Sequence, residues 1–385
     1  MIGLDRSLCC LEKHVFIDGD KTTLSDIRHD MCDWVGLSQD HDDSGCLLTL
    51  FELEGKAFDT TPPKKFDRVS ELLGKRDPWA LVHPSRRLWW GIDKLKEART
   101  LASDSDRSYH RDVFVPSSDL FKQLSPWRVD PSISESDDPM APSCCSNDGW
   151  VSPPTYNRFG TRTGRLTVTS GPRVLTVRQS TRVSFVAVDA DHIMVSFDFS
   201  SLEARVALAL AGRDVLVEDD PYTIIAKLMK IDDRDEAKRA TFAALYSDPT
   251  DANQRDPRVS TVRRIFKLGE TFATLKRSMD AGNPVRNLHG RIIPDVSEAT
   301  LYNNYVQSTG CDVTLLGFRE LVRELSMLGV KPHFLLHDAL FASVPVSCLN
   351  EAARIAAKGV EVPKFKLTFP IKASTTDGRP ILVSR

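Results

Sequence analysis

The sharpest change in the pattern of apolar and polar residues lies between positions 193 and 212. Residues 193–197 alternate between large apolar and smaller or polar side chains, which predicts a half-buried β-strand. From Leu202 onward, large apolar residues recur every four positions until Gly212, which predicts a helix. Asp198 lies between the two elements, so its carboxylate would stand on a rigid support at a solvent-facing edge. This position suits a metal ligand in a cleft, and it equally suits a residue that caps the helix.

A second apolar run, residues 334–344, carries His337 and Asp338 in its middle. Because buried charges without partners are rare, the run predicts two strands that meet at a tight turn with Asp338 at its tip. The alternative is a buried aspartate held in a salt bridge. Two aspartates, one at a strand end and one on a hairpin, can together hold two Mg²⁺ ions about 3.5–4 Å apart. Mg²⁺ favours sites in which one or two carboxylates act together with substrate phosphates.

Four side chains suited to ligand binding recur every four residues, at Arg234, Lys238, Phe242 and Tyr246. This spacing places all four on one face of a helix, and the acidic residues at 232–236 suit its cap and first turn. The two cations near the helix N-terminus would bind a triphosphate, with the rings placed for a base and a sugar. The alternative is an amphipathic helix whose rings lie in the core and whose charges lie at the rim.

A third pattern is a run of arginines without acids. Residues 158–188 contain no Asp or Glu, although a solvated protein surface normally mixes both signs. An anionic partner is therefore indicated, and the alternative is an ordinary basic loop. Short hydroxyl side chains within residues 161–166 suit contacts with phosphate and sugar groups. The arginines of the run are Arg158, Arg162, Arg165, Arg173, Arg178 and Arg182.

Composition limits the class of protein. With 385 residues, 41% apolar and 27% charged, the chain is long enough for two or three domains of ordinary globular type. Its net charge of -2 gives no overall argument for a nucleic-acid partner, so that argument rests on local charge. No apolar run is long enough for a membrane span, and the N-terminus lacks a signal-peptide pattern. Eight cysteines without metal-binding spacing fit reduced thiols, so we expect a cytoplasmic protein with no membrane partner.

The N-terminal third is less informative. Asp18 and Asp20 lie two apart after an apolar pair, which we interpret as a polar turn rather than a nuclease metal site. The stretch from Phe66 to Phe121 has a mostly helical pattern. Residues 130–155 are rich in Ser, Pro and Asp, which predicts a linker or a long mobile loop.

Six stretches resemble the motifs of DNA polymerase family A, the bacterial DNA polymerase I type, and they follow the order that the motifs have in that family. They lie within residues 156–372. In chain order, residues 163–166 match T-G-R-L; residues 198–205 (DFSSLEAR) resemble D-Y-S-Q-I-E-L-R; Arg234 to Tyr246 match R-x3-K-x3-F/Y-x3-Y; residues 289–294 resemble G-R-x-x-x-P; residues 303–312 resemble N-x-P-x-Q-G-x-A-A-D; and residues 337–338 match the start of H-D-E.

The resemblance implies an α+β chain with the right-hand polymerase fold, in which an antiparallel palm sheet carries helical fingers and a helical thumb. It also implies an assignment of domains. These are an N-terminal region of unknown role (1–65), a thumb-like helical region and linker (66–150), the first part of the palm (151–212), the fingers (213–285) and the second part of the palm (286–385).

The implied activity is that of a DNA-directed DNA polymerase, which adds deoxynucleotides to a primer 3′ end with two Mg²⁺ ions, for which Mn²⁺ can substitute. The implied partners are primer–template DNA, deoxynucleotides and a separate exonuclease or processivity subunit. The implied location is a nucleoid or phage-infected host cytoplasm. The implied catalytic residues are Asp198, Asp338 and Lys238. The implied metal ligands are Asp198, Phe199 and Asp338. The implied nucleotide-binding residues are Arg234, Lys238, Phe242, Tyr246 and Glu203, and the implied primer–template contacts are Thr163, Arg165, Arg182, Arg291, Asn303, Gln307 and His337.

The chain departs from the family pattern at Ala339, where the family has an acid, and at Ala243 and Ser247, where it has glycines. Two other functions stay open: a single-subunit RNA polymerase, against which Glu203 and Phe242 argue, and a non-catalytic DNA-binding accessory subunit. A proofreading domain needs about 150–200 residues. Since the region before the palm must also hold a thumb, we expect no 3′→5′ exonuclease activity in this chain.

Overall fold

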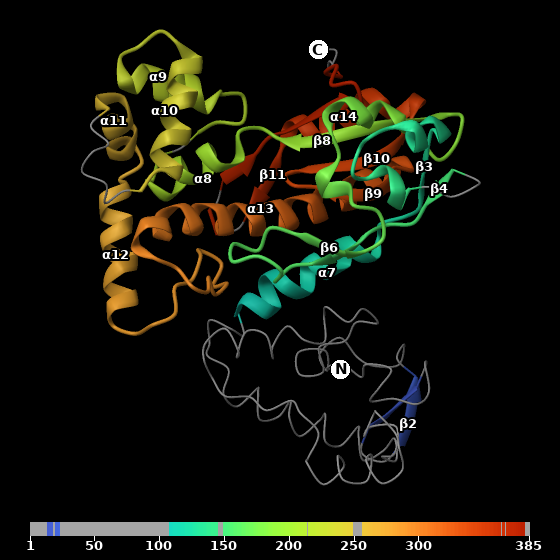
Figure 1. Cartoon of the computed structure of the whole chain (residues 1–385), viewed down its shortest axis with the longest axis horizontal. Coiled ribbons are helices and arrows are strands. Elements are labelled where there is room, and N and C mark those ends of the chain that lie inside the picture. The colour runs from blue at the N-terminus through green and yellow to red at the C-terminus, as the bar shows by residue number, and fades with distance from the viewer. Residues whose placement is uncertain are drawn as a thin grey trace. The chain divides into compact units, whose positions relative to one another are not determined.

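The computed structural model describes residues 14–17, 20–23 and 108–381, except 145–148, 214, 249–255, 363 and 366 (Figure 1). The chain divides into two compact units, Met1–Phe114 and Val115–Arg385. In the first unit, β1 (His14–Ile17) pairs antiparallel with β2 (Asp20–Thr23). Asp20 opens β2, whereas Asp18 and the helices predicted for the thumb before residue 108 lie outside the described residues.

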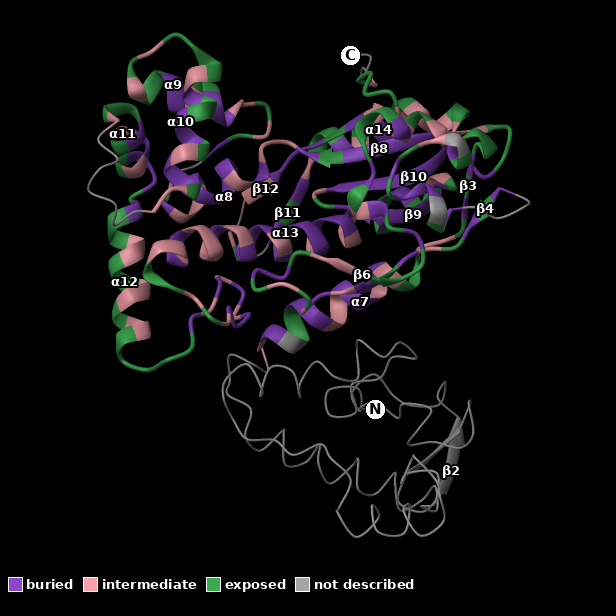
Figure 2. Ribbon diagram, in the orientation of Figure 1, coloured by how far each residue is buried: buried purple, intermediate pink, exposed green. Residues whose placement is uncertain are grey.

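The second unit is built around a four-stranded antiparallel sheet with the strand order β13-β8-β10-β9. Its two inner strands are almost fully buried, as Figure 2 shows, because each packs apolar side chains on both faces. This sheet confirms the prediction of an α+β chain with an antiparallel sheet. The strands are β8 (His192–Phe199), β9 (Lys331–Leu336), β10 (Ala339–Pro345) and β13 (Ile371–Thr375).

The long helix α13 (Leu301–Leu325) lies against this sheet (Figure 1). The ring of Phe199 contacts Phe318 of α13 at a centroid distance of 4.9 Å. Gly317 permits this approach, because a Cβ atom there would lie 2.6 Å from the Phe199 ring. The interface therefore fixes the end of β8 that carries Asp198. The other helices packed near the sheet are α7 (Val115–Lys122), α8 (Leu202–Leu210) and α14 (Leu349–Lys358).

Four further helices form a cluster beside α8, which we call the helical cluster (Figure 1). Three of them begin with an aspartate whose carboxylate accepts backbone N–H groups of the first turn: Asp220, Asp233 and Asp256. Such caps satisfy backbone N–H groups that have no partner within the helix, so these helices begin at defined positions. The helices are α9 (Pro221–Met229), α10 (Arg234–Tyr246), α11 (Pro257–Ile265) and α12 (Leu268–Asp280).

Short strands complete the second unit. In the three-stranded sheet β4-β3-β7, Trp127 and Phe185 pack against Phe334 at centroid distances of 4.6 and 5.3 Å, so this small sheet is anchored on the main one. The short strands are β3 (Trp127–Val129), β4 (Trp150–Val151), β5 (Thr155–Asn157), β6 (Thr167–Ser170), β7 (Phe185–Val186), β11 (Val360–Val362) and β12 (Leu367–Phe369). No helix of the described residues is long and apolar enough to cross a membrane.

The structure differs from the linker predicted within residues 130–155. Residues 131–144 fold into two 3₁₀ turns around Asp138, which is 2% exposed. Its carboxylate accepts the N–H groups of Met140 (2.8 Å) and Arg178 (2.9 Å) and the hydroxyl of Thr181 (2.7 Å). The polar composition of this segment therefore supplies a buried turn network rather than a solvated chain.

Candidate active site

The two predicted aspartates meet at the ends of neighbouring strands. Asp198 is the next-to-last residue of β8, and its register partner on β10 is Ala339. β9 and β10 are joined by a two-residue turn, His337–Asp338, with His337 in the left-handed region at φ 56°. The N–H of Phe199 donates to the carbonyl of Asp338 at 3.1 Å, which locks the two segments together. The predicted tight turn is confirmed, and Asp198 is not a helix cap, because Ser201 occupies that position in α8.

The electrostatics of this pair favour a bound cation. Loss of hydration, followed by the negative charge of Asp338, raises the pKa of Asp198 to about 7, although its side chain still opens to solvent on one side. Arg182 and Lys372 act in the opposite direction. Two adjacent carboxylates offer the hard oxygen ligands that Mg²⁺ prefers. The donor set therefore fits a divalent ion.

Asp198 has a charged neighbour on one adjacent strand and an apolar neighbour on the other. On one side, Lys372 of β13 is the register partner of Asp198, and on the other side Ala339 of β10 is its partner. Register partners in an antiparallel sheet point to the same face. The site thus presents two carboxylates and a lysine, where the acid of the family motif would have added a third carboxylate.

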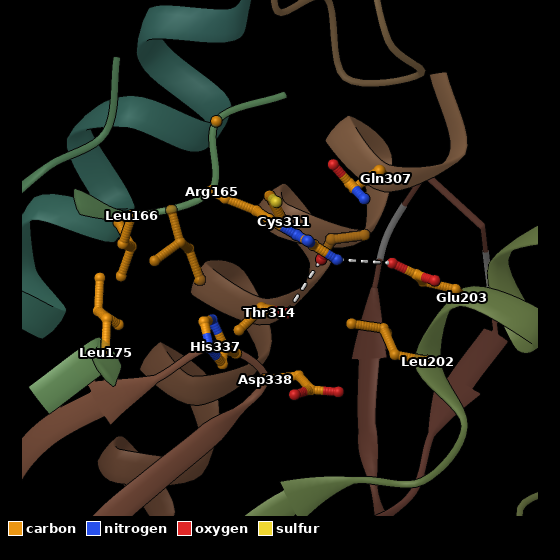
Figure 3. Close-up of a pocket in the computed structure, with 13 residues that line it drawn as sticks. Arg165, Leu166, Leu175, Leu202, Glu203, Gln307, Cys311, Thr314, His337 and Asp338 are labelled. Atoms are coloured by element: carbon orange, nitrogen blue, oxygen red, sulfur yellow. Dashed lines mark hydrogen bonds and ion pairs between the residues drawn. The ribbon is translucent and has the colours of Figure 1, made fainter. Parts of the chain in front are cut away.

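A cavity of about 90 Å³ opens beside Asp338 (Figure 3). Segments far apart in the sequence line it: Arg165 from the arginine run, Glu203 from α8, Gln307 from α13, and His337 with Asp338 from the hairpin. All of these are predicted site residues, and the structure brings them to one place.

Glu203 connects two of these segments. Its carboxylate accepts a hydrogen bond from Nη2 of Arg165 at 3.2 Å and another from the hydroxyl of Tyr246 on α10. Arg205, two residues further on, donates instead to the backbone carbonyls of Ser200 and Leu216, at 3.0 Å each. Glu203 is therefore not a surface residue paired with Arg205, and its carboxylate joins α10 to the arginine run.

The exposed face of α10 carries the predicted side chains. Phe242 and Tyr246 are 39% and 42% exposed, and their rings lie nearly parallel with centroids 6.0 Å apart. The buried face of this helix consists of other residues, so the alternative in which the rings form the core is wrong. That buried face is made of Ala237, Ala240, Thr241, Ala244 and Leu245.

Sequence analysis missed the residues that face the two cations of α10. Asp220 forms an ion pair with Arg234 at 2.8 Å. The buried ring of Tyr222 lies 5.2 Å from Cζ of Arg234 and 5.8 Å from Nζ of Lys238. Both residues belong to the start of α9, where no spacing pattern distinguishes them from an ordinary helix beginning.

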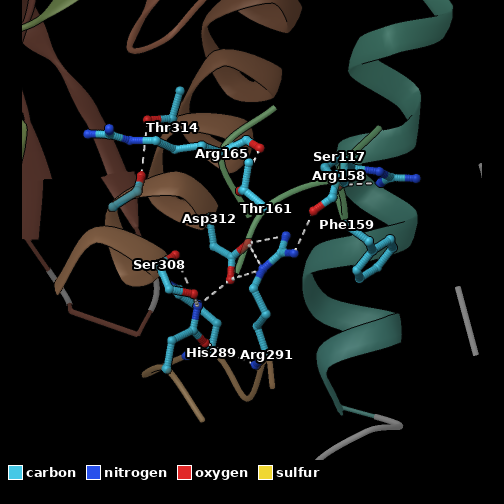
Figure 4. Close-up of polar contacts among 12 residues, drawn as sticks. Ser117, Arg158, Phe159, Thr161, Arg165, His289, Arg291, Ser308, Asp312 and Thr314 are labelled. Atoms are coloured by element: carbon cyan, nitrogen blue, oxygen red, sulfur yellow. Dashed lines mark hydrogen bonds and ion pairs between the residues drawn. The ribbon is translucent and has the colours of Figure 1, made fainter. Parts of the chain in front are cut away.

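A buried ion pair anchors the arginine run (Figure 4). Arg291 and Asp312 are 2% and 0% exposed, and Nη2 of Arg291 donates to Oδ1 of Asp312 at 2.9 Å. Nη1 of Arg291 donates to the carbonyl of Arg158 at 2.9 Å, while Nδ2 of Asn287 donates to Oδ2 of Asp312 at 2.6 Å. The predicted contact of Arg291 with DNA is therefore corrected, because its guanidinium faces the protein interior.

The same ion pair explains a glycine of the T-G-R-L motif. Gly164 has φ 79°, and a Cβ atom there would lie 2.6 Å from Cζ of Arg291. Its neighbour Thr163 is buried and donates its hydroxyl to Oε1 of Gln307 at 2.9 Å. The motif is thus held in place from two sides while Arg165 stays exposed.

The remaining predicted residues differ in their surroundings. Asn303 is half-buried and lies one helical turn before Gln307 on α13. Arg182 is half-buried, with Cζ 6.0 Å from the centre of the Phe341 ring. Arg158, from the same basic run, is buried and donates to the hydroxyls of Ser117 and Ser118. Part of the basic run is therefore structural.

One cluster outside this site has metal-binding side chains. Asp189, Asp191 and His192 bring three ligand atoms within 4.8 Å at the beginning of β8, the end opposite Asp198. Asp189 is paired with Lys331 at 2.9 Å, and Asp191 with His192 at 2.8 Å. Both carboxylates already have partners within the chain, so we assign no metal to this cluster.

Comparisons with known proteins agree with the motifs. No protein-family model matches the chain. The chain is 24% identical over 276 residues to a protein from Thermus filiformis described as "DNA polymerase I, thermostable". That match covers 60% of this chain and 32% of the Thermus protein, so the chain spans about a third of that relative's length. The predicted resemblance to family A polymerases is thus confirmed in sequence.

A solved structure, the "POL domain of Pol1 from M. smegmatis complex with DNA primer-template and dNTP", is also similar. The likeness has a TM-score of 0.47 and 14% identity, and it covers 86% of this chain and 64% of that chain.

Proposed function

We propose that the chain is a template-directed DNA polymerase that adds deoxynucleotides to a primer 3′ end. The observation that carries this proposal is the meeting of Asp198 and Asp338 at the ends of β8 and the β9–β10 hairpin, beside a cavity that Glu203 links to α10. In this proposal the main sheet is the palm and the helical cluster is the fingers. The Thermus relative, described as a DNA polymerase I, supports it.

Different side chains would bind the metal ions and the triphosphate. The carboxylates of Asp198 and Asp338, with the carbonyl of Phe199, would hold two Mg²⁺ ions, with Mn²⁺ as a substitute. When bound, such ions activate the primer 3′ hydroxyl and neutralise the leaving pyrophosphate. Arg234 and Lys238 bind the triphosphate, and Lys238 can also give a proton to the leaving group.

The residues around the cavity position the DNA and the nucleotide. Phe242 and Tyr246 pack against the base and the sugar of the incoming nucleotide. Arg165, Gln307 and His337 line the cavity and reach the primer–template. Asn303, Thr163 and Arg182 complete the implied set, with Thr163 acting through Gln307.

Primer extension tests the proposal directly. The full chain should extend a primer on a DNA template with deoxynucleotides and divalent metal, and it should extend poorly with ribonucleotides. Efficient extension with ribonucleotides alone would favour a single-subunit RNA polymerase. DNA binding without extension under any metal condition would favour an accessory subunit.

Replacing the exposed ring of α10 should change selection at the sugar 3′ position. Phe242→Tyr adds one hydroxyl beside Tyr246, where it can replace the 3′ hydroxyl that a dideoxynucleotide lacks. We expect dideoxynucleotide incorporation, measured against the matching deoxynucleotide, to rise about tenfold, the value of one good hydrogen bond. Phe272→Tyr on α12 adds the same group elsewhere and is the control. An unchanged ratio would mean that Phe242 does not face the sugar.

Removing the carboxylate of Glu203 should relax selection at the 2′ position. The bonds from Arg165 and Tyr246 hold this carboxylate beside the cavity, where a ribonucleotide would have to displace it. Leaving such a group unpaired costs about 1–3 kcal/mol, so Glu203→Ala should raise ribonucleotide incorporation about tenfold or more. Glu203→Gln keeps the volume of the side chain but removes its charge, so it shows whether the charge or the occupied space excludes the ribonucleotide. If Glu203→Ala kept the parental ribo-to-deoxy ratio, selection would lie elsewhere.

A further inference from the structure

The guanidinium of Arg234 is already bound to a carboxylate of the chain. Nε donates to Oδ2 of Asp220 at 2.8 Å, and Nη2 donates to Oδ1 at 3.0 Å, which is the two-pronged geometry that arginine also uses for phosphate. Nη1 lies 3.3 Å from Oδ1 of Asp235. Both partners are only partly exposed, at 46% for Arg234 and 31% for Asp220. An anionic ligand that used the same edge of the guanidinium would therefore meet a competitor.

A second interaction, the capping of α9, holds Asp220 in this position. Its Oδ2 accepts the backbone N–H and the hydroxyl of Thr223, each at 2.9 Å, and so caps α9. Pro221 follows it at the first position of the helix, where its fixed φ suits a helix start. The carboxylate therefore stays at the helix end whether or not Arg234 is bound to it.

The second cation of α10 is held differently. Lys238 lies over the face of Tyr222, as Arg234 does, and the Phe242 ring lies 6.4 Å from the same ring. Within the described part of the chain, no carboxylate lies within ion-pair distance of Lys238. One cation of this pair is thus occupied by a carboxylate, whereas the other is free to attract an anion.

We propose that Asp220 is a positioning residue that occupies the place of a phosphate group on Arg234 and sets the affinity of α10 for a triphosphate. The inference rests on the proposed function, because it assumes that Arg234 binds the nucleotide phosphates. An incoming triphosphate first meets Lys238 and then takes the guanidinium from Asp220. Asp220 weakens binding at this step, and it disfavours anions too weakly charged to displace it.

The test is the affinity of the full chain for inorganic tripolyphosphate, measured by calorimetry without DNA or metal. Asp220→Asn removes the charge but keeps an oxygen for the helix cap. We expect the Kd to fall about threefold to tenfold, as expected for a partly exposed charged pair. Arg234→Ala in the Asp220→Asn background should abolish the gain.

The chain offers a matched control. Asp256 caps α11 and holds Arg258 by the same two-pronged pair, with Nε and Nη2 each 3.0 Å from a carboxylate oxygen. Asp256→Asn makes the same charge change and should leave the Kd within about twofold. If the Kd for tripolyphosphate fell equally in Asp220→Asn and Asp256→Asn, the effect would come from net charge, and the inference would be overturned. Weaker binding in Asp220→Asn, or no binding by any variant, would overturn it too, whereas failure of primer extension alone would count only against the proposed function.

Discussion

Asp198→Ala and Asp338→Ala should each reduce primer extension by about a thousandfold or more, the scale expected when a main electrostatic element of an active site is removed. The two side chains come from neighbouring strand ends and form a single anionic site, so neither can replace the other. Binding of primer–template DNA should change little, since the predicted DNA contacts lie on other residues. Extension is measured in a single-turnover assay, and DNA binding by fluorescence anisotropy.

The same strand provides a control for the loss of charge. Asp191→Ala removes one exposed carboxylate just before β8, at the end opposite Asp198, and it should leave extension within about twofold, as is usual for exposed surface positions. Extension by Asp198→Ala at more than a tenth of the parental rate would contradict the assignment of the metal site. A parallel loss of DNA binding would point to misfolding, which the circular dichroism of each variant would show.

Those parts of the fold that depend on local periodicity could be predicted from the sequence. Alternation of apolar residues before Asp198 identified β8, and the isolated polar pair in an apolar run identified the β9–β10 turn. The four-residue spacing from Arg234 to Tyr246 identified the exposed face of α10. In each case the pattern indicates which side of a single helix or strand faces the core, and residues close together in the sequence are enough to show it.

The contacts that sequence analysis missed connect residues distant in the chain. Asp312 lies 21 positions after Arg291, and the pair is visible only when α13 packs against the loop before it. The polar segment around Asp138 gave the wrong prediction, because its partners Arg178 and Thr181 come 40 and 43 positions later. Composition shows that a segment is polar, but it does not show whether the protein supplies hydrogen-bond partners.

The position of Lys372 shows the same limit in the active site. Ala339 was visible in the sequence as a missing acid, yet no pattern indicated that a lysine would lie across from Asp198 on the other side. The register of β13 decides this, because it pairs Lys372 with Asp198, which lies 174 positions earlier in the chain.

Removing one partner of the ion pair between Arg291 and Asp312 should destabilise the second unit strongly. Asp312→Ala would leave the Arg291 guanidinium buried without its main counter-charge, and it would remove one of the acceptors of Nδ2 of Asn287, which also donates to Ser308. Breaking a buried pair from one side costs about 3–5 kcal/mol. We expect the free energy of unfolding, measured by hydrogen exchange of the α13 amides, to fall by about this amount.

Replacing both partners separates two contributions to the loss of stability: the lost attraction between the charges and the cost of leaving one charge buried and unpaired. Arg291→Met combined with Asp312→Leu removes the ion pair without leaving either charge unpaired, and such replacements are often close to neutral. The double variant should therefore be more stable than Asp312→Ala alone. Equal destabilisation would mean that the hydrogen bonds to Asn287 and to the Arg158 carbonyl matter more than the charges.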